Sequence, residues 1–211
     1  MSVRSKLRFV SLLVTGSRTE RRQALHVIMM AWKGVDVRGV SVEGLGLDQA
    51  RSSWYSDSGG PDLDAVFGTF SILPTDAVLD IGCGKGGALI TLARYAFARV
   101  DGLEISPELV RVARKNLLAA RIFRANVFCS DAAEFSELDE YTYLYMYNPF
   151  PAVVVRKVLE NVFASVARRP RRLTLVYKNP VCDDLVRSCG FRAIRDFADS
   201  SLLFRAYVTG T

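Results

Sequence analysis

From residue 61 onward, short apolar segments alternate with longer ones in which apolar residues recur every three or four positions. The first pattern predicts buried strands, and the second predicts amphipathic helices that cover them. The predicted strands span 77–81, 100–103, 127–129, 143–147, 173–177, 191–197 and 202–208, and the predicted helices span 62–72, 87–95, 107–118, 152–167 and 181–188. This alternation predicts an α/β fold, a doubly wound, mostly parallel seven-stranded sheet with helices on both faces and the last strand antiparallel.

Residues 1–60 lack this alternation and carry many Lys and Arg residues. Ser17 and Glu20 fit a capping box ahead of a wide apolar face, so we predict a helix over 18–33. We expect residues 1–60 to form a basic N-terminal arm with a helical cap, packed on a main domain at 61–211. A helix that binds a membrane surface or a partner is the alternative.

The composition sets limits on partners and location. A chain of 211 residues with half of them hydrophobic can bury one substantial core. The net charge of +6 favours an anionic partner, whether nucleic acid, an acidic protein or a membrane surface. The apolar stretch at 9–14 contains Ser11 and is too short to cross a bilayer, so we expect no integral membrane segment and a cytoplasmic protein. The four cysteines form no CxxC pair and the chain has one histidine, so neither a disulfide scaffold nor a metal site is indicated.

A glycine-rich loop, within the segment VLDIGCGKGGAL at 78–89, joins the first predicted strand to the helix after it. Gly82, Gly84 and Gly86 allow a sharp turn and a close approach of the backbone to a ligand. A dinucleotide site would read G-x-G-x-x-G, but here Asp80 stands two residues before the first glycine. A carboxylate at that place would repel phosphates and favour a ligand that carries positive charge.

This D-x-G-x-G-x-G pattern resembles motif I of the class I methyltransferases that use S-adenosylmethionine, a ligand with an ammonium and a sulfonium group. Glu104 ends the second strand, where a carboxylate can accept both ribose hydroxyls, and the run at 105–116 looks like the region that follows motif I in that family. Asp131 matches the position from which the family contacts the adenine amino group. The resemblance covers 54–208 and implies S-adenosylmethionine as cofactor and S-adenosylhomocysteine as product. The residues that it implies for cofactor binding are Asp80, Gly82, Cys83, Gly84, Gly86, Glu104, Ile105, Asp131 and Asn148.

Two residues of the glycine loop have other interpretations. No base is placed to activate Cys83, so we expect a small packed residue there and no nucleophile. Lys85 could contact the substrate or only solvent.

The segment YMYNPFP at 145–151 ends the fourth strand with an amide, two prolines and a ring. It resembles the N-P-P-Y or N-P-P-F motif of amino methyltransferases, but Phe150 comes one residue early, so their substrate specificities do not carry over. We expect Asn148 to align the nucleophile and Phe150 to exclude water from the acceptor. Alternatively, Asn148 caps a helix that begins near 149 and Phe150 belongs to the core. Tyr55 matches the family's segment that closes over the cofactor, and is a candidate lid residue or an ordinary loop aromatic.

The acceptor is the least determined part of the sequence. No histidine is placed to act as a base for a hydroxyl acceptor, so we favour N-methylation of an amine on a small molecule. A protein lysine or RNA is the alternative acceptor, and an inactive cofactor-binding interaction protein is the alternative function. The basic residues Arg168, Arg169, Arg171 and Arg172 could bind phosphates or only line a solvated turn.

Overall fold

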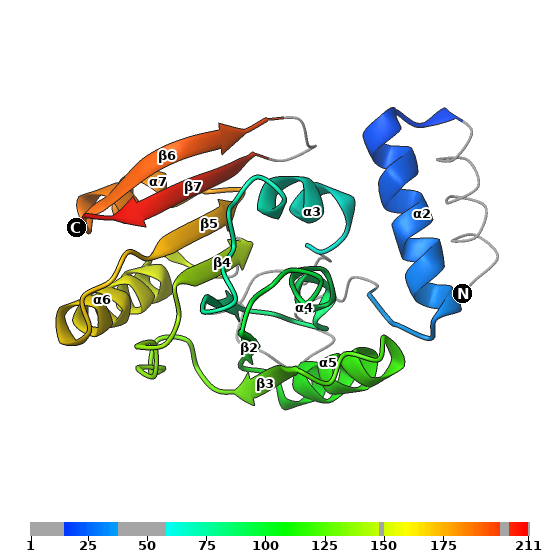
Figure 1. Ribbon diagram of the computed structural model, residues 1–211, viewed down its shortest axis with the longest axis horizontal. Coiled ribbons are helices and arrows are strands. Elements are labelled where there is room, and N and C mark those ends of the chain that lie inside the picture. Colours follow the sequence, from blue (N-terminus) through cyan, green and yellow to red (C-terminus); the bar gives the residue numbers. More distant parts are fainter. Residues whose placement is uncertain (1–14, 38–57, 148–149, 199–202, 211) are drawn as a thin grey trace.

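The computed structural model describes residues 15–37, 58–147, 150–198 and 203–210. At its centre is a seven-stranded sheet in the order β3-β2-β1-β4-β5-β7-β6 (Figure 1). The strands are β1 (Ala77–Ile81), β2 (Arg99–Glu104), β3 (Ala125–Cys129), β4 (Tyr143–Tyr147), β5 (Thr174–Lys178), β6 (Phe191–Phe197) and β7 (Phe204–Thr209). The helices are α2 (Arg18–Trp32), α3 (Pro61–Phe67), α4 (Gly87–Leu92), α5 (Pro107–Ala119), α6 (Ala152–Arg168) and α7 (Asp183–Ser188).

The strand directions confirm the predicted fold class. Strands β1 to β5 pair in parallel, and β7 runs antiparallel to both β5 and β6. In this register Asp80 of β1 lies between Gly102 of β2 and Tyr145 of β4. The carboxyl ends of these parallel strands therefore meet at one edge of the sheet, where ligands bind in doubly wound folds.

Successive residues of each strand point to opposite faces of the sheet, which divides the core into two layers. Val78 and Tyr145 pack in the layer that contains buried residues of α2, α3, α4 and α5. Leu79 and Met146 pack in the opposite layer with buried residues of α6 and α7. Because both faces are covered, the central strands read as continuous apolar runs in the sequence.

The N-terminal helical cap is present as α2, which begins where its capping box predicts. The Ser17 hydroxyl accepts a hydrogen bond from the Glu20 N–H at 3.3 Å, and the Ser17 N–H donates to the Glu20 carboxylate at 2.8 Å. One side of α2 is buried through Ala24, His26 and Met30. In Figure 1 the helix lies at one edge of the molecule, beyond α3 and α4.

Two helices, α3 and α4, end well before the predicted residue. α3 ends at Phe67 and α4 ends at Leu92, and tighter turns follow in which each N–H donates three residues back, as Phe70 does to Phe67 and Tyr95 to Leu92. The rings of Phe70 and Tyr95 still pack against Phe67, with centroids 5.9 and 6.1 Å away. Apolar residues thus keep their helical spacing beyond the last helical residue. This is why the sequence pattern predicted longer helices.

Candidate active site

The glycine loop after β1 is tied to the end of β2. Gly82, Gly84 and Gly86 have φ values of 81°, 52° and 80°, a left-handed conformation that glycine adopts without strain. The N–H groups of Gly82 and Cys83 both donate to the carbonyl oxygen of Leu103, at 2.8 and 2.9 Å. The loop therefore turns sharply at the carboxyl edge of the sheet and stays close to Glu104, the next residue of β2.

Glu104 is held in a defined position at this edge. One carboxylate oxygen accepts from the Gly84 N–H at 3.0 Å and the other from the Ser106 N–H at 2.9 Å. Burial raises the pKa of Glu104 above its ordinary value, and these backbone donors partly oppose that effect. Each oxygen has two lone pairs, so the carboxylate can still accept hydrogen bonds from a ligand.

Asp131 follows β3 and lies in the adjacent loop. The Ser130 N–H donates to the carbonyl oxygen of Glu104 at 3.0 Å, which fixes this loop beside the end of β2. The Asp131 carboxylate accepts from the Ala133 N–H at 2.9 Å, and this local turn orients the side chain. Two carboxylates from neighbouring strand ends thus lie at the same edge of the sheet.

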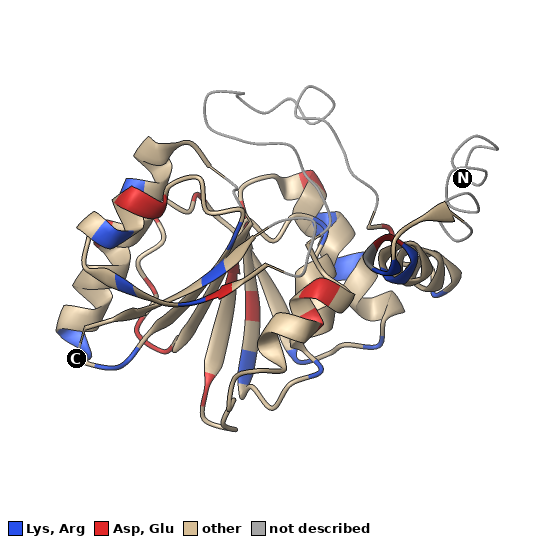
Figure 2. Ribbon diagram, turned by 90° about the horizontal axis from the view of Figure 1, so that it is seen from above, with Lys and Arg blue, Asp and Glu red and all other residues tan. Residues whose placement is uncertain are grey.

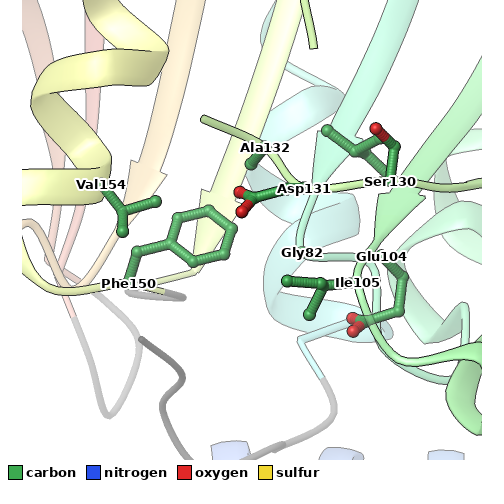
Figure 3. A pocket seen from close by; sticks show the side chains of 9 residues that line it. Gly82, Glu104, Ile105, Ser130, Asp131, Ala132, Phe150 and Val154 are labelled. Carbon is green, nitrogen blue, oxygen red and sulfur yellow. The ribbon is translucent and has the colours of Figure 1, made fainter. Parts of the chain in front are cut away.

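These elements surround one cleft (Figure 3). The described residues that line it are Gly82, Leu103, Glu104, Ile105, Ser130, Asp131, Ala132, Phe150 and Val154. Figure 3 shows the Phe150 ring extending toward Asp131 and Ile105, with Glu104 beside Ile105. Apolar side chains suit the faces of a flat base, and carboxylates suit hydroxyl and amino donors. The lining therefore fits the adenosine part of S-adenosylmethionine.

The cleft brings together four of the nine residues predicted to bind the cofactor, namely Gly82, Glu104, Ile105 and Asp131. It also includes Phe150, which was predicted for the acceptor. The sequence did not predict Leu103, Ser130, Ala132 and Val154. Leu103 precedes Glu104, Ser130 and Ala132 flank Asp131, and Val154 follows Phe150 by four positions, so each lies close in sequence to a predicted residue.

Asp80, Cys83, Gly84 and Gly86 are not among the described residues that line this cleft. Asp80 is 2% exposed on β1, beneath the loop. Cys83 is buried against β2, where a Cβ on Gly102 would come within 2.6 Å of the Cys83 sulfur. Burial, and then the charges of Asp80 and Glu104, raise the pKa of the Cys83 thiol. The thiol therefore stays protonated at neutral pH and acts as a packing group.

Asn116 of α5 ties the glycine loop to the segment that follows α2. Its side-chain amide donates to the carbonyl oxygens of Lys85 and Asp36, both at 2.9 Å, and accepts from the Asp36 N–H at 2.8 Å. Lys85 itself is 5% exposed and forms an ion pair with Asp36 at 3.0 Å. The expectation that Lys85 contacts only solvent is therefore wrong, because the neighbouring segment covers it.

Two of the predicted acceptor residues, Tyr55 and Asn148, lie outside the described residues. Phe150 is partly buried and packs against the layer that contains α6, while it also lines the cleft. α6 begins at Ala152 and its N-cap is Pro151. A cap by Asn148 on a helix that begins near 149 does not fit this boundary.

A buried lysine at the carboxyl end of β5 was not predicted. Lys178 is the last residue of β5, is 7% exposed, and pairs in register with Tyr147 of β4 and Phe204 of β7. Its ammonium lies 4.6 Å from the centre of the Tyr147 ring and 5.1 Å from that of Phe204. Both rings attract the cation through their faces. A charged residue at the end of an apolar strand was the signal available in the sequence.

Arg168, Arg169 and Arg171 make contacts within the chain that stabilise the fold. Arg168 forms an ion pair with Asp139 at 2.7 Å, and Arg169 pairs with Glu140. Arg171 donates to the carbonyl oxygens of Leu138 and Tyr141, both at 2.7 Å. These side chains hold the segment before β4, which leaves fewer cations in this turn to contact phosphates.

Among the described residues, no three His, Cys, Asp or Glu side chains gather closely enough to hold a metal ion. In the same part of the chain, no helix is long and apolar enough to cross a membrane.

Comparisons with known proteins bear on the family and the fold. Residues 78–171 match the family model of a methyltransferase domain. No curated protein matches the sequence. An RNA methyltransferase from Salinibacter ruber in complex with S-adenosyl-L-homocysteine has the same fold, with 20% identity, a TM-score of 0.55, and coverage of 69% of this chain and 88% of that one.

Two further solved structures share the fold. A SAM-dependent methyltransferase from Aquifex aeolicus has 16% identity and a TM-score of 0.58, over 71% of this chain and 90% of that one. A ribosomal protein L11 methylase from Lactobacillus delbrueckii subsp. bulgaricus has 12% identity and a TM-score of 0.57, over 71% of this chain and 77% of that one.

The seven-stranded sheet, with its glycine loop and the acidic end of β2, is a Rossmann-like methyltransferase fold, which the described chain shares with these solved structures. Residues 78–171 match a methyltransferase domain, and this match supports an S-adenosylmethionine-dependent methyltransferase.

Proposed function

We propose that the adenosine part of the cofactor lies in the cleft of Figure 3 and that the enzyme N-methylates an amine on a small molecule. The observation that supports the cofactor position is the convergence of Glu104, Asp131 and Phe150 on one cleft. Glu104 would accept the ribose hydroxyls, Asp131 would accept from the adenine amino group, and Phe150 would cover the base. Bound S-adenosylmethionine supplies an activated methyl group, so alignment and desolvation provide most of the rate enhancement.

The proposed acceptor region lies beyond the carboxyl end of β4. Asn148 would align the acceptor nitrogen, Phe150 would exclude water on the cofactor side, and Tyr55 would close over the site. Tyr147 and Lys178 border this region because they end neighbouring strands. An amine must lose its proton before it attacks, and a nearby ammonium lowers the pKa of an amine by like-charge repulsion. The buried Lys178 thus favours a neutral acceptor amine without a dedicated base.

Protein and RNA acceptors receive less support. The similar structures include an RNA methyltransferase and a ribosomal protein methylase, but at 20% and 12% identity they bear on the fold alone. Arg168, Arg169 and Arg171 are engaged within the chain, so they do not form a ready phosphate-binding surface. A small molecule that enters the edge beyond β4 needs no such surface.

The experiment is a partition assay. The purified protein is incubated with methyl-labelled S-adenosylmethionine and extract from its source cells, and label is counted in the small-molecule, protein and RNA fractions. We expect label in small molecules, bound through an acid-stable N–CH₃ group. Label in RNA or protein would contradict the acceptor class. Cofactor binding by calorimetry without label in any fraction would support the inactive interaction protein.

The role of Asn148 has its own test. Asn148→Ala should lower turnover at saturating acceptor while cofactor affinity changes little, because the amide would act on the acceptor nitrogen. Asn161→Ala is the matched control. Asn161 lies on α6, and its amide donates to the carbonyl oxygens of Ala133 and Phe135. Unchanged turnover in Asn148→Ala would exclude the alignment role.

A further inference from the structure

The outer side of α2 carries a stripe of exposed residues that methyl transfer does not use. Its members alternate by four and three positions, which places them on one side of a helix. They are Arg18, Arg22, Leu25, Met29 and Trp32. Trp32 is 90% exposed, Met29 53% and Leu25 49%. The stripe is thus cationic in the first half of the helix and apolar in the second.

Packing within the described chain does not account for this apolar half. α2 already buries its opposite side through Ala24, His26 and Met30. Ile28, beside the stripe, is also 37% exposed. Several large apolar side chains that adjoin one another on a surface mark an interaction site, whereas single exposed ones do not.

The charges around the stripe have one sign. Arg21 lies beside Arg18 and Arg22, and Lys33 follows Trp32 at the end of the helix. The one acidic residue of α2 is Glu20, which faces away from the stripe and accepts from the Ser17 N–H in the capping box. In Figure 2 the Lys and Arg segments of α2 lie at the edge of the molecule, apart from the sheet. This surface therefore complements an anionic partner.

Cationic and apolar side chains of α2 also line a cleft between this helix and the ends of α4 and α5. Arg22, Met29 and Lys33 line it from α2, and Arg94 and Ile122 line it from the main domain. Cationic and apolar side chains line the α2 side of this cleft, while Asp64 on the facing side forms an ion pair with Arg94 at 3.2 Å. The α2 side can therefore accommodate an anionic head group next to acyl chains.

We propose that α2 docks the protein on an anionic lipid bilayer. Leu25, Met29 and Trp32 would enter the interface between head groups and acyl chains, and Arg18 and Arg22 would contact the phosphates. A helix with an apolar face and cations beside it lies in the plane of a membrane. Tryptophan prefers the interface because its ring is apolar and its N–H is polar. This inference does not depend on the identity of the methyl acceptor.

The test is co-sedimentation of the full chain with vesicles of phosphatidylcholine alone or with about one third phosphatidylglycerol. We expect at least tenfold tighter binding to the anionic vesicles. Arg18→Gln with Arg22→Gln should remove most of that preference, and Leu25→Ser with Trp32→Ser should abolish binding to both. Leu73→Ser is the matched control, because Leu73 is 57% exposed but lies outside α2.

A second measurement reports on Trp32 directly. Trp54→Phe leaves Trp32 as the single tryptophan, since the chain has two. Its emission should shift to shorter wavelength when anionic vesicles are added, as the ring leaves water. No shift, or vesicle binding that the α2 substitutions do not change, would overturn the proposal.

If something other than a bilayer covers the stripe, the same variants give different results. If a second copy covers it, the wild type will have twice the mass of Trp32→Ser in solution and will not bind vesicles. If another part of the chain covers it, Leu25→Ser with Trp32→Ser will lower the melting temperature well beyond the Leu73→Ser control. Either result would overturn docking on a bilayer.

Discussion

The carboxylate of Glu104 accepts a hydrogen bond from the Gly84 N–H at 3.0 Å, which joins the acidic end of β2 to the glycine loop after β1. The two motifs lie 20 residues apart in sequence, and this bond fixes their relative position before any ligand enters. These two segments are therefore held together by the fold itself.

Glu104→Gln should weaken S-adenosylmethionine binding. The amide keeps the size of the side chain but removes the charge that strengthens hydrogen bonds from the ribose hydroxyls. We expect a loss of affinity of about tenfold or more, measured by calorimetry. Glu108→Gln is the control, because that exposed residue lies in the first turn of α5, two positions after Ser106. Equal affinities in wild type and Glu104→Gln would place the ribose elsewhere.

The raised pKa of Glu104 predicts two opposite effects of pH. The native state holds this proton more readily than the unfolded chain, so the contribution of Glu104 to the free energy of unfolding falls as pH rises from the ordinary carboxyl range through the raised pKa. Cofactor affinity should rise over the same window, because the ionised carboxylate is the better acceptor. Melting curves and calorimetry from about pH 4 to pH 7 measure both. Glu104→Gln should lack both of these contributions.

Lys178→Met should shift the pH dependence of methyl transfer. Removal of the buried ammonium raises the pKa of an acceptor amine nearby, so half-maximal turnover should move to higher pH by about one unit. Lys157→Met is the control, because that lysine is exposed on α6 and pairs with Glu160. An unchanged pH profile of turnover in Lys178→Met would show that this lysine does not affect the pKa of the acceptor amine.

Gly59→Ala should destabilise the protein. A Cβ at Gly59 would lie 2.3 Å from the carbonyl oxygen of Gly87, at the start of α4, and backbone atoms cannot move aside easily. We expect a loss of about 1–3 kcal/mol in the free energy of unfolding, measured by urea denaturation. Gly210→Ala should have little effect, because nothing lies within 4 Å of the added atom.

Arg171→Gln should also destabilise, while Arg172→Gln should not. Arg171 donates to the carbonyl oxygens of Leu138, Tyr141 and Arg169, and the exposed Arg172 is its direct neighbour. Loss of these bonds should lower the free energy of unfolding by about 2 kcal/mol. If both variants unfold alike, the guanidinium of Arg171 does not hold the segment before β4.

Local signals explain what the sequence could predict. α5 begins at Pro107 as expected, because Ser106 accepts from the Leu109 N–H and proline suits the first helical position. Glu104 was identified because it ends a predicted strand about 20 residues after the glycines. Asp131 was identified through the resemblance to the methyltransferases. These signals are all contained in short segments of the sequence.

Contacts between distant segments were not predictable in this way. The bonds between Asn116 and Asp36 join residues 80 positions apart, and the burial of Lys85 depends on them. Lys178 lies between Tyr147 and Phe204 because β4, β5 and β7 are neighbours in the sheet, an order that periodicity does not specify. Tertiary packing decides these positions.

The sheet order also keeps the cleft of Figure 3 apart from the C-terminal strands. The described residues that line this cleft come from the ends of β1, β2 and β3 and from the region where α6 begins. The family match ends at residue 171, before β5 starts at Thr174. No described residue from β5 to the C-terminus lines the cleft or falls within the family match. Exposed substitutions in this part of the gene can therefore accumulate while the lining of the cleft is kept.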